Sequence, residues 1–270
     1  MRRDSSRYGN FPKRQKSRER PWNRASPAFG KLWEHAGKCR VDLYEIKIKL
    51  YLLKDIKIEE TQTYLAYFID SVMVKDNMFL GIHETNQYKF YTFDSLYPLA
   101  KNGVYQKDNS YMFRIRTLDY QLAQYLYDTL AKNRTKEFQG LTAEVKIIKP
   151  KLIKKIYTLT PVILKTEQGY WKNSIKTEDF EKRLKTNLIK KYKDITGEEI
   201  NEDFQLYYQI NFKNKVPVSR KYKGIKLLGD MIELEIAEND NAQKLAMLAI
   251  GAGLLEMNAR GFGFVNYIYY

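Results

Sequence analysis

The feature that most constrains the fold of this chain is an order of strand and helix signals that occurs twice. The stretch YEIKIKLYLL from Tyr44 alternates apolar and charged residues, which is typical of a half-buried strand, whereas apolar residues from Leu65 to Val72 have the spacing of a helix face. Read this way, residues 41–150 predict the order β-α-β-β-α-β, and residues 151–270 repeat it. We therefore predict an α+β protein with two tandem ferredoxin-like (βαββαβ) domains, whose strand order the sequence leaves open.

The expected helices begin and end at residues suited to those positions. Short polar residues cap helix N-termini, and glycine ends helices, because both satisfy backbone groups that the helix leaves unpaired. Such residues stand at the expected boundaries: Glu60 or Thr61, Asp119, Gly197, and Asn239 or Asp240. Between the last two helices, residues 222–237 are interpreted as one long strand.

Positive charge is concentrated at the start of the chain. Residues 1–40 contain twelve Lys and Arg against three acids, a net charge of +9, and the remaining 35 basic and 29 acidic residues give +6. This Arg-, Ser- and Pro-rich segment has too few apolar residues to fold alone, so we predict a disordered extension. It is either a basic arm for nucleic acid or an extension without a role. The rest is basic and rich in tyrosine, which suits phosphates and stacked bases.

Few residues are available for metal or disulfide chemistry. Cys39 is the single cysteine, and His35 and His83 are the two histidines. A disulfide framework is therefore excluded, no metal or other cofactor is expected, and the composition fits a reducing cytoplasm. The chain has no run of eighteen apolar residues, so no membrane partner is expected.

The segment GAGLLEMNARGFGF near residue 270 contains two G-x-G pairs, Gly251 with Gly253 and Gly261 with Gly263. Glycine lets a ligand approach the backbone, successive N–H groups can form an anion-binding concavity, and Arg260 adds a positive charge. The segment lacks the Gly-Lys-Ser/Thr of a phosphate-binding P-loop, and it follows a helix rather than opening one. The alternative is purely structural: a helix C-cap at Gly251 and a strand bulge at Gly261 and Gly263.

These features resemble a known family. Two ferredoxin-like halves with a G-x-G…G-F-G segment before the last strand are similar to the repeat-associated RNA-binding proteins (RAMP superfamily) of CRISPR systems. The stretches FLGIHETNQYKFYTFDSLYP and YMFRIRT resemble, more narrowly, the CRISPR-associated endoribonuclease that cuts precursor CRISPR RNA within its repeats. The resemblance extends over roughly residues 44–270 and leaves the basic extension outside.

The resemblance implies a metal-independent cleavage in which the RNA 2′-OH attacks the adjacent phosphate. The products are a 2′,3′-cyclic phosphate (or 3′-phosphate) and a 5′-OH, and the protein stays bound to the mature guide RNA. His83 matches the family's histidine and is expected as general acid, with general base as the alternative; Lys89 is expected to stabilise the phosphorane charge. The family's first-helix tyrosine falls at Asp70, a departure. Tyr67, one turn earlier, is the candidate replacement, and Tyr64 is a second.

RNA contacts are expected from further basic residues. Lysines between the two halves are suited to phosphates, and two arginines on one strand share a face from which they can stack on a base or bind a phosphate. With the glycine-rich segment, the expected RNA-binding residues are Gly251, Gly253, Arg260, Gly261, Gly263, Arg114, Arg116, Lys149, Lys151, Lys154 and Lys155. The helical lysines are interpreted as a solvated face: Lys185, Lys190, Lys191 and Lys193.

Two other functions compete with the nuclease. The departure at Asp70 favours a catalytically inactive RAMP-type RNA-binding scaffold of a CRISPR effector complex, and the basic composition alone allows an RNA-binding protein outside CRISPR systems. The expected partners are CRISPR repeat RNA or precursor crRNA and other subunits of an effector complex. The protein itself is expected to be a monomer or a homodimer.

Overall fold

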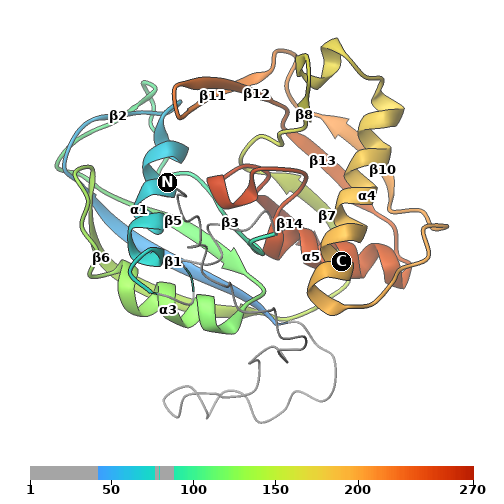
Figure 1. Ribbon diagram of the computed structural model, residues 1–270, viewed down its shortest axis with the longest axis horizontal. Coiled ribbons are helices and arrows are strands. Elements are labelled where there is room, and N and C mark those ends of the chain that lie inside the picture. The colour runs from blue at the N-terminus through green and yellow to red at the C-terminus, as the bar shows by residue number, and fades with distance from the viewer. Residues whose placement is uncertain (1–41, 77–78, 80–87) are drawn as a thin grey trace, which may run out of the picture. The chain divides into compact units, whose positions relative to one another are not determined.

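The computed structural model describes residues 42–76, 79 and 88–270 (Figure 1). The basic extension, Cys39 and His83 lie outside the described residues. Val41–Tyr270 form one compact unit, which is described here by itself.

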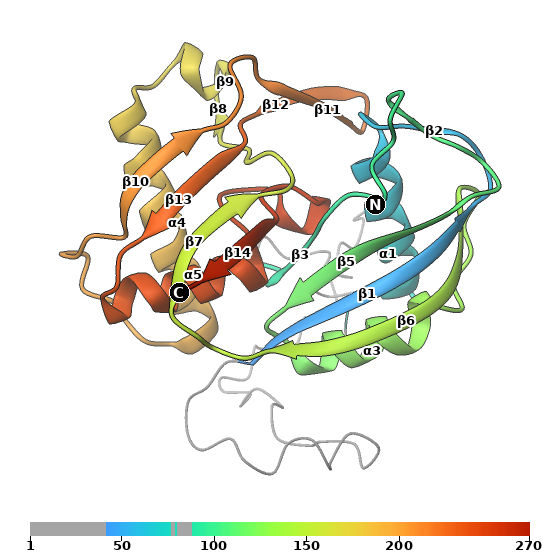
Figure 2. The same cartoon turned by 180° about the vertical axis from the view of Figure 1, so that it is seen from behind.

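The first half contains a four-stranded antiparallel sheet covered on one face by two helices. Its strands lie in the order β3-β5-β1-β6. They are β1 (Leu43–Leu52), β3 (Tyr91–Phe93), β5 (Ser110–Thr117) and β6 (Phe138–Ile148), and the helices are α1 (Thr61–Met73) and α3 (Tyr120–Leu130). Figures 1 and 2 show both helices on one side of this sheet. Phe68 of α1 packs edge-on against Phe138 of β6, with ring centroids 5.7 Å apart.

The second half repeats this arrangement. Its sheet has the order β10-β13-β7-β14, again antiparallel, and two helices cover one face (Figure 2). The strands are β7 (Ile153–Thr158), β10 (Tyr207–Phe212), β13 (Ile232–Ile236) and β14 (Val265–Tyr269), and the helices are α4 (Thr177–Thr196) and α5 (Asp240–Ala252). In both sheets the second, third, first and fourth long strands lie side by side, so the predicted tandem ferredoxin-like fold is confirmed. The domain limits 41–150 and 151–270 stay a prediction.

Shorter elements connect the long ones. They are β2 (Ile56–Lys57), which pairs with β4 (Val104–Tyr105); β8 (Lys165–Thr166), which pairs with β9 (Gly169–Tyr170); and the 3₁₀ helices η2 (Trp171–Asn173) and η3 (Asn258–Arg260). None of the helices in the described ranges is long and apolar enough to cross a bilayer.

The predicted helix boundaries are confirmed. The Asp119 carboxylate accepts a hydrogen bond from the Leu122 N–H at 3.1 Å, and the Asn239 side chain accepts one from the Ala242 N–H at 3.0 Å. Gly197 ends α4 with a left-handed φ of 75°, a conformation that glycine adopts without steric cost.

The single strand expected over residues 222–237 is wrong. The chain instead forms a hairpin of β11 (Val218–Tyr222) and β12 (Ile225–Gly229), after which β13 begins a separate pairing. The reversal occurs at Lys223 and Gly224, both with positive φ (49° and 78°), which is the backbone of a tight two-residue hairpin turn.

This hairpin contacts helix α1 of the other half. The Lys221 N–H donates to the Glu59 carbonyl at 2.7 Å, and the Thr63 hydroxyl donates to the Lys221 carbonyl at 2.7 Å. The Lys221 ammonium also pairs with the Glu59 carboxylate at 2.5 Å. These bonds fix the end of the hairpin, and therefore Tyr222 and Lys223, beside α1.

A buried charge pair joins the two halves. Arg116 is only 1% exposed; its Nε donates to Glu45 at 2.7 Å, and its Nη1 donates to the Val265 carbonyl of β14 at 2.6 Å. The guanidinium also lies 4.5 Å from the centre of the Phe264 ring. The prediction that Arg116 contacts RNA is therefore wrong, because its donors are used inside the protein.

We expect the Arg116→Met substitution to lower the free energy of unfolding by about 3–5 kcal/mol, because it leaves the Glu45 carboxylate buried without its main partner. Lys146→Met is the matched control: Lys146 contacts the same carboxylate at 2.9 Å, but its side chain is 64% exposed. Its loss should cost about 1 kcal/mol or less. Urea unfolding of both variants measures the difference, and equal losses would contradict the structural role of Arg116.

Candidate functional site

An ion pair connects the glycine-rich segment to helix α1. The Arg260 guanidinium in η3 pairs with the Asp70 carboxylate, and both side chains are mostly buried (19% and 24% exposed). Burial alone would lower the pKa of Arg260, but Asp70, Tyr91 and Tyr222 together raise that pKa above its usual value. Asp70, the position at which the family's tyrosine was expected, therefore holds Arg260 in place.

The glycines of this segment face protein atoms. A Cβ at Gly251 would meet the Leu118 and Leu43 side chains, and one at Gly261 would meet the Phe93 ring. Gly253, with φ of 78°, ends helix α5. The structural alternative of a helix C-cap thus applies at Gly253 rather than Gly251.

The N–H groups of three of these glycines are also used internally. Those of Gly253, Gly261 and Gly263 donate to the carbonyls of Ala249, Asn258 and Pro161 at 2.8–2.9 Å. The expected anion-binding concavity is therefore not built from these N–H groups, since each already has an acceptor. Any contact of RNA with this segment has to use other groups, of which Arg260 is the cationic one.

Lys191 of α4 holds the glycine-rich segment in place, a role that the sequence did not predict. Its ammonium donates to the carbonyls of Gly253 and Leu255 and to the Asn258 side chain at 2.7–2.9 Å. The expected solvated position is wrong, because Lys191 is 1% exposed. Burial lowers its pKa to about 7, although the charge of Glu256 opposes the shift. The sequence did contain a signal for this burial: Lys191 has the helical spacing that puts it on the same face as the buried Leu184 and Leu188.

Lys89, predicted as a catalytic residue, lies in the same electrostatic neighbourhood. Burial lowers its pKa, the positive charges of Arg260 and Lys223 lower it further, and the Asp70 carboxylate acts in the opposite direction. These electrostatic interactions link four residues: Asp70 of α1, Lys89 before β3, Arg260 of the glycine-rich segment and Lys223 of the hairpin. Three of these four side chains are cationic, which suits an anionic ligand such as a phosphate.

Two tyrosines border this charge cluster, which consists of Asp70, Lys89, Lys223 and Arg260. Tyr91 is buried and its hydroxyl donates to the Ala259 carbonyl at 3.4 Å. Tyr222 of the hairpin has its ring centre 5.8 Å from the Arg260 guanidinium. Burial raises the pKa of Tyr222, partly offset by Arg260.

The tyrosines of α1 itself are placed differently. Tyr67 is 57% exposed, one turn before Asp70, so its hydroxyl is open to solvent and to a ligand. Tyr64 has the Lys54 ammonium 4.2 Å from the centre of its ring, so its ring face is already occupied. Tyr67 therefore stays the first-helix candidate. His83 lies outside the described residues.

The other predicted RNA-binding residues do not join this cluster. Arg114 shares the face of Arg116, since both guanidinium groups lie over Phe264, and its Nε donates to Asp94 at 2.7 Å. Lys155 is half-buried and pairs with Glu233 at 3.0 Å. Lys149, Lys151 and Lys154 are exposed around the connection between β6 and β7, where contact with RNA stays a prediction.

Comparisons with known proteins agree with this architecture. Residues 142–267 match the family model described as "CRISPR associated protein Cas6, C-terminal". No curated protein sequence matches the chain.

Three solved structures share the fold at 18–20% sequence identity. "CRISPR associated protein Cas6" is 20% identical with a TM-score of 0.60, covering 84% of this chain and 99% of its own. "An RAMP protein binding different RNA substrates" is 20% identical with a TM-score of 0.62, covering 83% and 99%. A Cas6-related protein from Pyrococcus furiosus is 18% identical with a TM-score of 0.61, covering 84% and 98%.

We expect Lys191 to make stability depend on pH. Its folded-state pKa of about 7 lies below the unfolded value of about 10.4, so between these values the unfolded chain holds a proton that the folded protein has released. The free energy of unfolding should rise with pH in this window, by up to about 1.4 kcal/mol per unit.

Denaturant unfolding at about pH 7 and about pH 9 measures this slope. Lys191→Met should lose it, while Lys193→Met, at an exposed lysine of the same helix, should keep it. Parallel slopes for wild type and Lys191→Met would show that Lys191 stays protonated throughout.

Proposed function

We propose that this chain is an endoribonuclease that cleaves precursor CRISPR RNA within its repeats, because residues 142–267 match the family model of the Cas6 C-terminal region. The observation that carries the proposal is the position of Lys89. Lys89 lies just before the aromatic strand β3 of the first half. It belongs to the same charge cluster as Arg260, which lies in the region matched by the family model. A cationic cluster at the meeting point of two halves is suited to a phosphate of the RNA backbone.

The proposed cleavage needs no metal, because RNA supplies its own nucleophile. The 2′-OH attacks the adjacent phosphorus and gives up its proton, and the bond from phosphorus to the 5′-oxygen breaks. The products are a 2′,3′-cyclic phosphate and a 5′-OH. His83 is proposed to donate the proton that the 5′-oxygen takes up. Tyr67 is proposed to assist removal of the 2′-OH proton.

Lys89 is proposed to stabilise the negative charge that develops on the phosphorane, with Arg260 nearby. Asp70 would hold the Arg260 side chain in a fixed position, so that its charge needs little rearrangement during the reaction. This division of roles explains why an acidic residue stands at the expected tyrosine position. The proposed partner is the repeat RNA, to which the protein stays bound after cleavage, with other subunits of a CRISPR effector complex.

One observation favours the inactive scaffold as a second candidate. The position matched to the family's tyrosine is Asp70, and its carboxylate is paired with Arg260. A protein of this kind would bind repeat RNA through the same cationic cluster without cutting it.

We expect wild-type protein to cut the repeat RNA of its own CRISPR array in EDTA, and His83→Ala to slow cutting about 10²–10⁴-fold by removing the proton donor. Lys89→Ala should slow it about 10²–10³-fold by removing a charge from the phosphorane. Lys101→Ala, at an exposed lysine, is the control.

Gel analysis of end-labelled RNA measures the rates, and a 2′-deoxy nucleotide at the cleavage position should abolish cutting in every variant. Tight binding without any cutting by wild type would favour the scaffold. Cutting that requires added divalent metal would overturn the proposed chemistry.

A second comparison identifies the tyrosine. Tyr67→Phe should slow single-turnover cleavage without weakening RNA binding, because only the hydroxyl is lost. Tyr222→Phe is its partner variant, since Tyr222 borders Arg260 from the hairpin. If Tyr67→Phe cuts at the wild-type rate and Tyr222→Phe does not, the hydroxyl comes from the hairpin instead of α1.

A further inference from the structure

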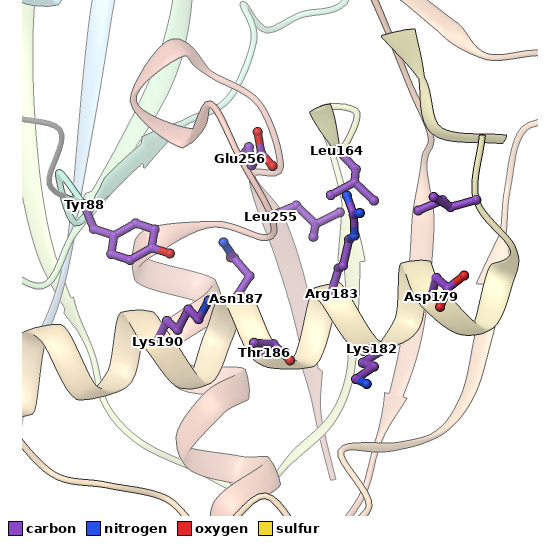
Figure 3. Close-up of a pocket in the computed structure, with 11 residues that line it drawn as sticks. Tyr88, Leu164, Asp179, Lys182, Arg183, Thr186, Asn187, Lys190, Leu255 and Glu256 are labelled. Carbon is purple, nitrogen blue, oxygen red and sulfur yellow. The ribbon is translucent and has the colours of Figure 1, made fainter. Parts of the chain in front are cut away.

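A separate cavity of about 580 Å³ lies between Leu255 and Glu256 of the glycine-rich segment, helix α4 and Tyr88 (Figure 3). This volume is within the range of small-ligand sites. The groups on its wall that can bind a ligand include Tyr88, Arg183, Asn187, Lys190 and Glu256. The cavity is distinct from the charge cluster, although Tyr88 directly precedes Lys89 in the chain.

Tyr88 offers an aromatic surface. Its side chain is 37% exposed, while Phe90, 6.2 Å away between ring centres, and the Lys191 ammonium, 5.7 Å from the ring centre, hold it in place. In Figure 3 its ring extends toward Asn187. Unpaired bases stack on aromatic rings that are fixed in position and partly exposed, as the Tyr88 ring is.

Helix α4 supplies the polar side of the cavity. Arg183, Asn187 and Lys190 are four and three residues apart, a spacing that puts them on one helix face. Both charged residues are exposed, so they are free to approach a phosphate. The Asn187 side-chain oxygen is buried and, among the described residues, has no hydrogen-bond partner. Such an acceptor is costly unless a ligand or water donates to it.

Glu256 completes the wall with a carboxylate from the glycine-rich segment. Burial raises its pKa, against the opposing charges of Lys165, Arg183 and Lys191. Acceptors beside an aromatic ring and two cations match a nucleotide, whose base offers N–H donors and a flat face and whose phosphate is anionic. A simple inorganic anion would use only the cations.

We propose that this cavity holds one unpaired nucleotide of the repeat RNA, with its base against Tyr88, its edge toward Asn187 and Glu256, and its phosphate near Arg183 or Lys190. Tyr88 directly precedes Lys89 in the chain, so their Cα atoms are about 3.8 Å apart. A nucleotide bound at Tyr88 would limit which phosphate of the same RNA can reach Lys89. This inference rests on the proposed function, but it concerns binding and can be measured apart from cleavage.

The test is a scan of the repeat RNA with single abasic nucleotides, made uncleavable by a 2′-deoxy nucleotide at any mapped cleavage position. Binding is measured by fluorescence anisotropy for wild type and Tyr88→Ala. We expect one position at which loss of the base weakens wild-type binding on the order of 10-fold. Tyr88→Ala should lose this penalty at that position only. Tyr88→Phe, which keeps the ring, should retain it.

Lys190→Ala should weaken binding and reduce its salt dependence, whereas Lys193→Ala, an exposed lysine that does not line the cavity, should leave binding unchanged. The proposal is overturned if no abasic penalty depends on Tyr88. It is also overturned if adenosine or cytidine monophosphate raises the Tm of wild type but not of Tyr88→Ala while the scan shows no such position, because the cavity would then take free nucleotides.

Cleavage of the unmodified RNA separates the two proposals. If the RNA is cut normally but no abasic penalty depends on Tyr88, the nuclease proposal is supported and the nucleotide pocket is refuted. If one abasic penalty depends on Tyr88 but the protein never cuts the RNA, the pocket is supported and the nuclease proposal is refuted. Failure to bind the repeat RNA overturns both.

Discussion

The arrangement of the two halves depends on one buried guanidinium. Arg116 donates hydrogen bonds to the Glu45 carboxylate of its own sheet and to the Val265 carbonyl of β14, the last strand of the other half. A fully desolvated charge is tolerated only where its partners are closely placed, so this contact strongly disfavours other relative positions of the two sheets. The Val265 carbonyl that it uses lies five residues after Arg260. Fixing β14 against β5 therefore also limits where Arg260 meets Asp70.

The glycine-rich segment is packed by the protein itself. Its glycines allow Leu43, Leu118 and Phe93 to pack closely against the backbone, and the Lys191 ammonium donates hydrogen bonds to its carbonyls. The glycines thus serve packing within the protein, although their number suggested a bound ligand. A segment held this firmly can present Arg260 on one side and Glu256 on the other without much loss of conformational freedom when RNA binds.

Much of the fold was readable from local patterns, because periodicity and capping act over a few residues. The βαββαβ order, the Asp119 and Asn239 caps and the Gly197 helix end all depend on near neighbours in sequence. The hairpin at Lys223 and Gly224 was missed, since Lys is not a residue that favours positive φ. Arg116 was predicted to contact RNA and Lys191 to face solvent. Both predictions failed because the burial of these residues depends on acceptors 149 and 62 residues away, respectively. The resemblance to the CRISPR-associated family is supported by the match over residues 142–267. The electrostatic interaction of Lys89 with Arg260 joins residues far apart in sequence, so no local pattern predicts it.

The ion pair between Asp70 and Arg260 also sets an order of events during synthesis. The first sheet, α1 and Lys89 are all made before residue 150, but the cationic partner that completes the cluster is made more than a hundred residues later. A chain still being translated can therefore fold its first half around Asp70 while the cluster lacks Arg260. The cluster is therefore complete only once both halves have been made, and the proposed cleavage would begin only then.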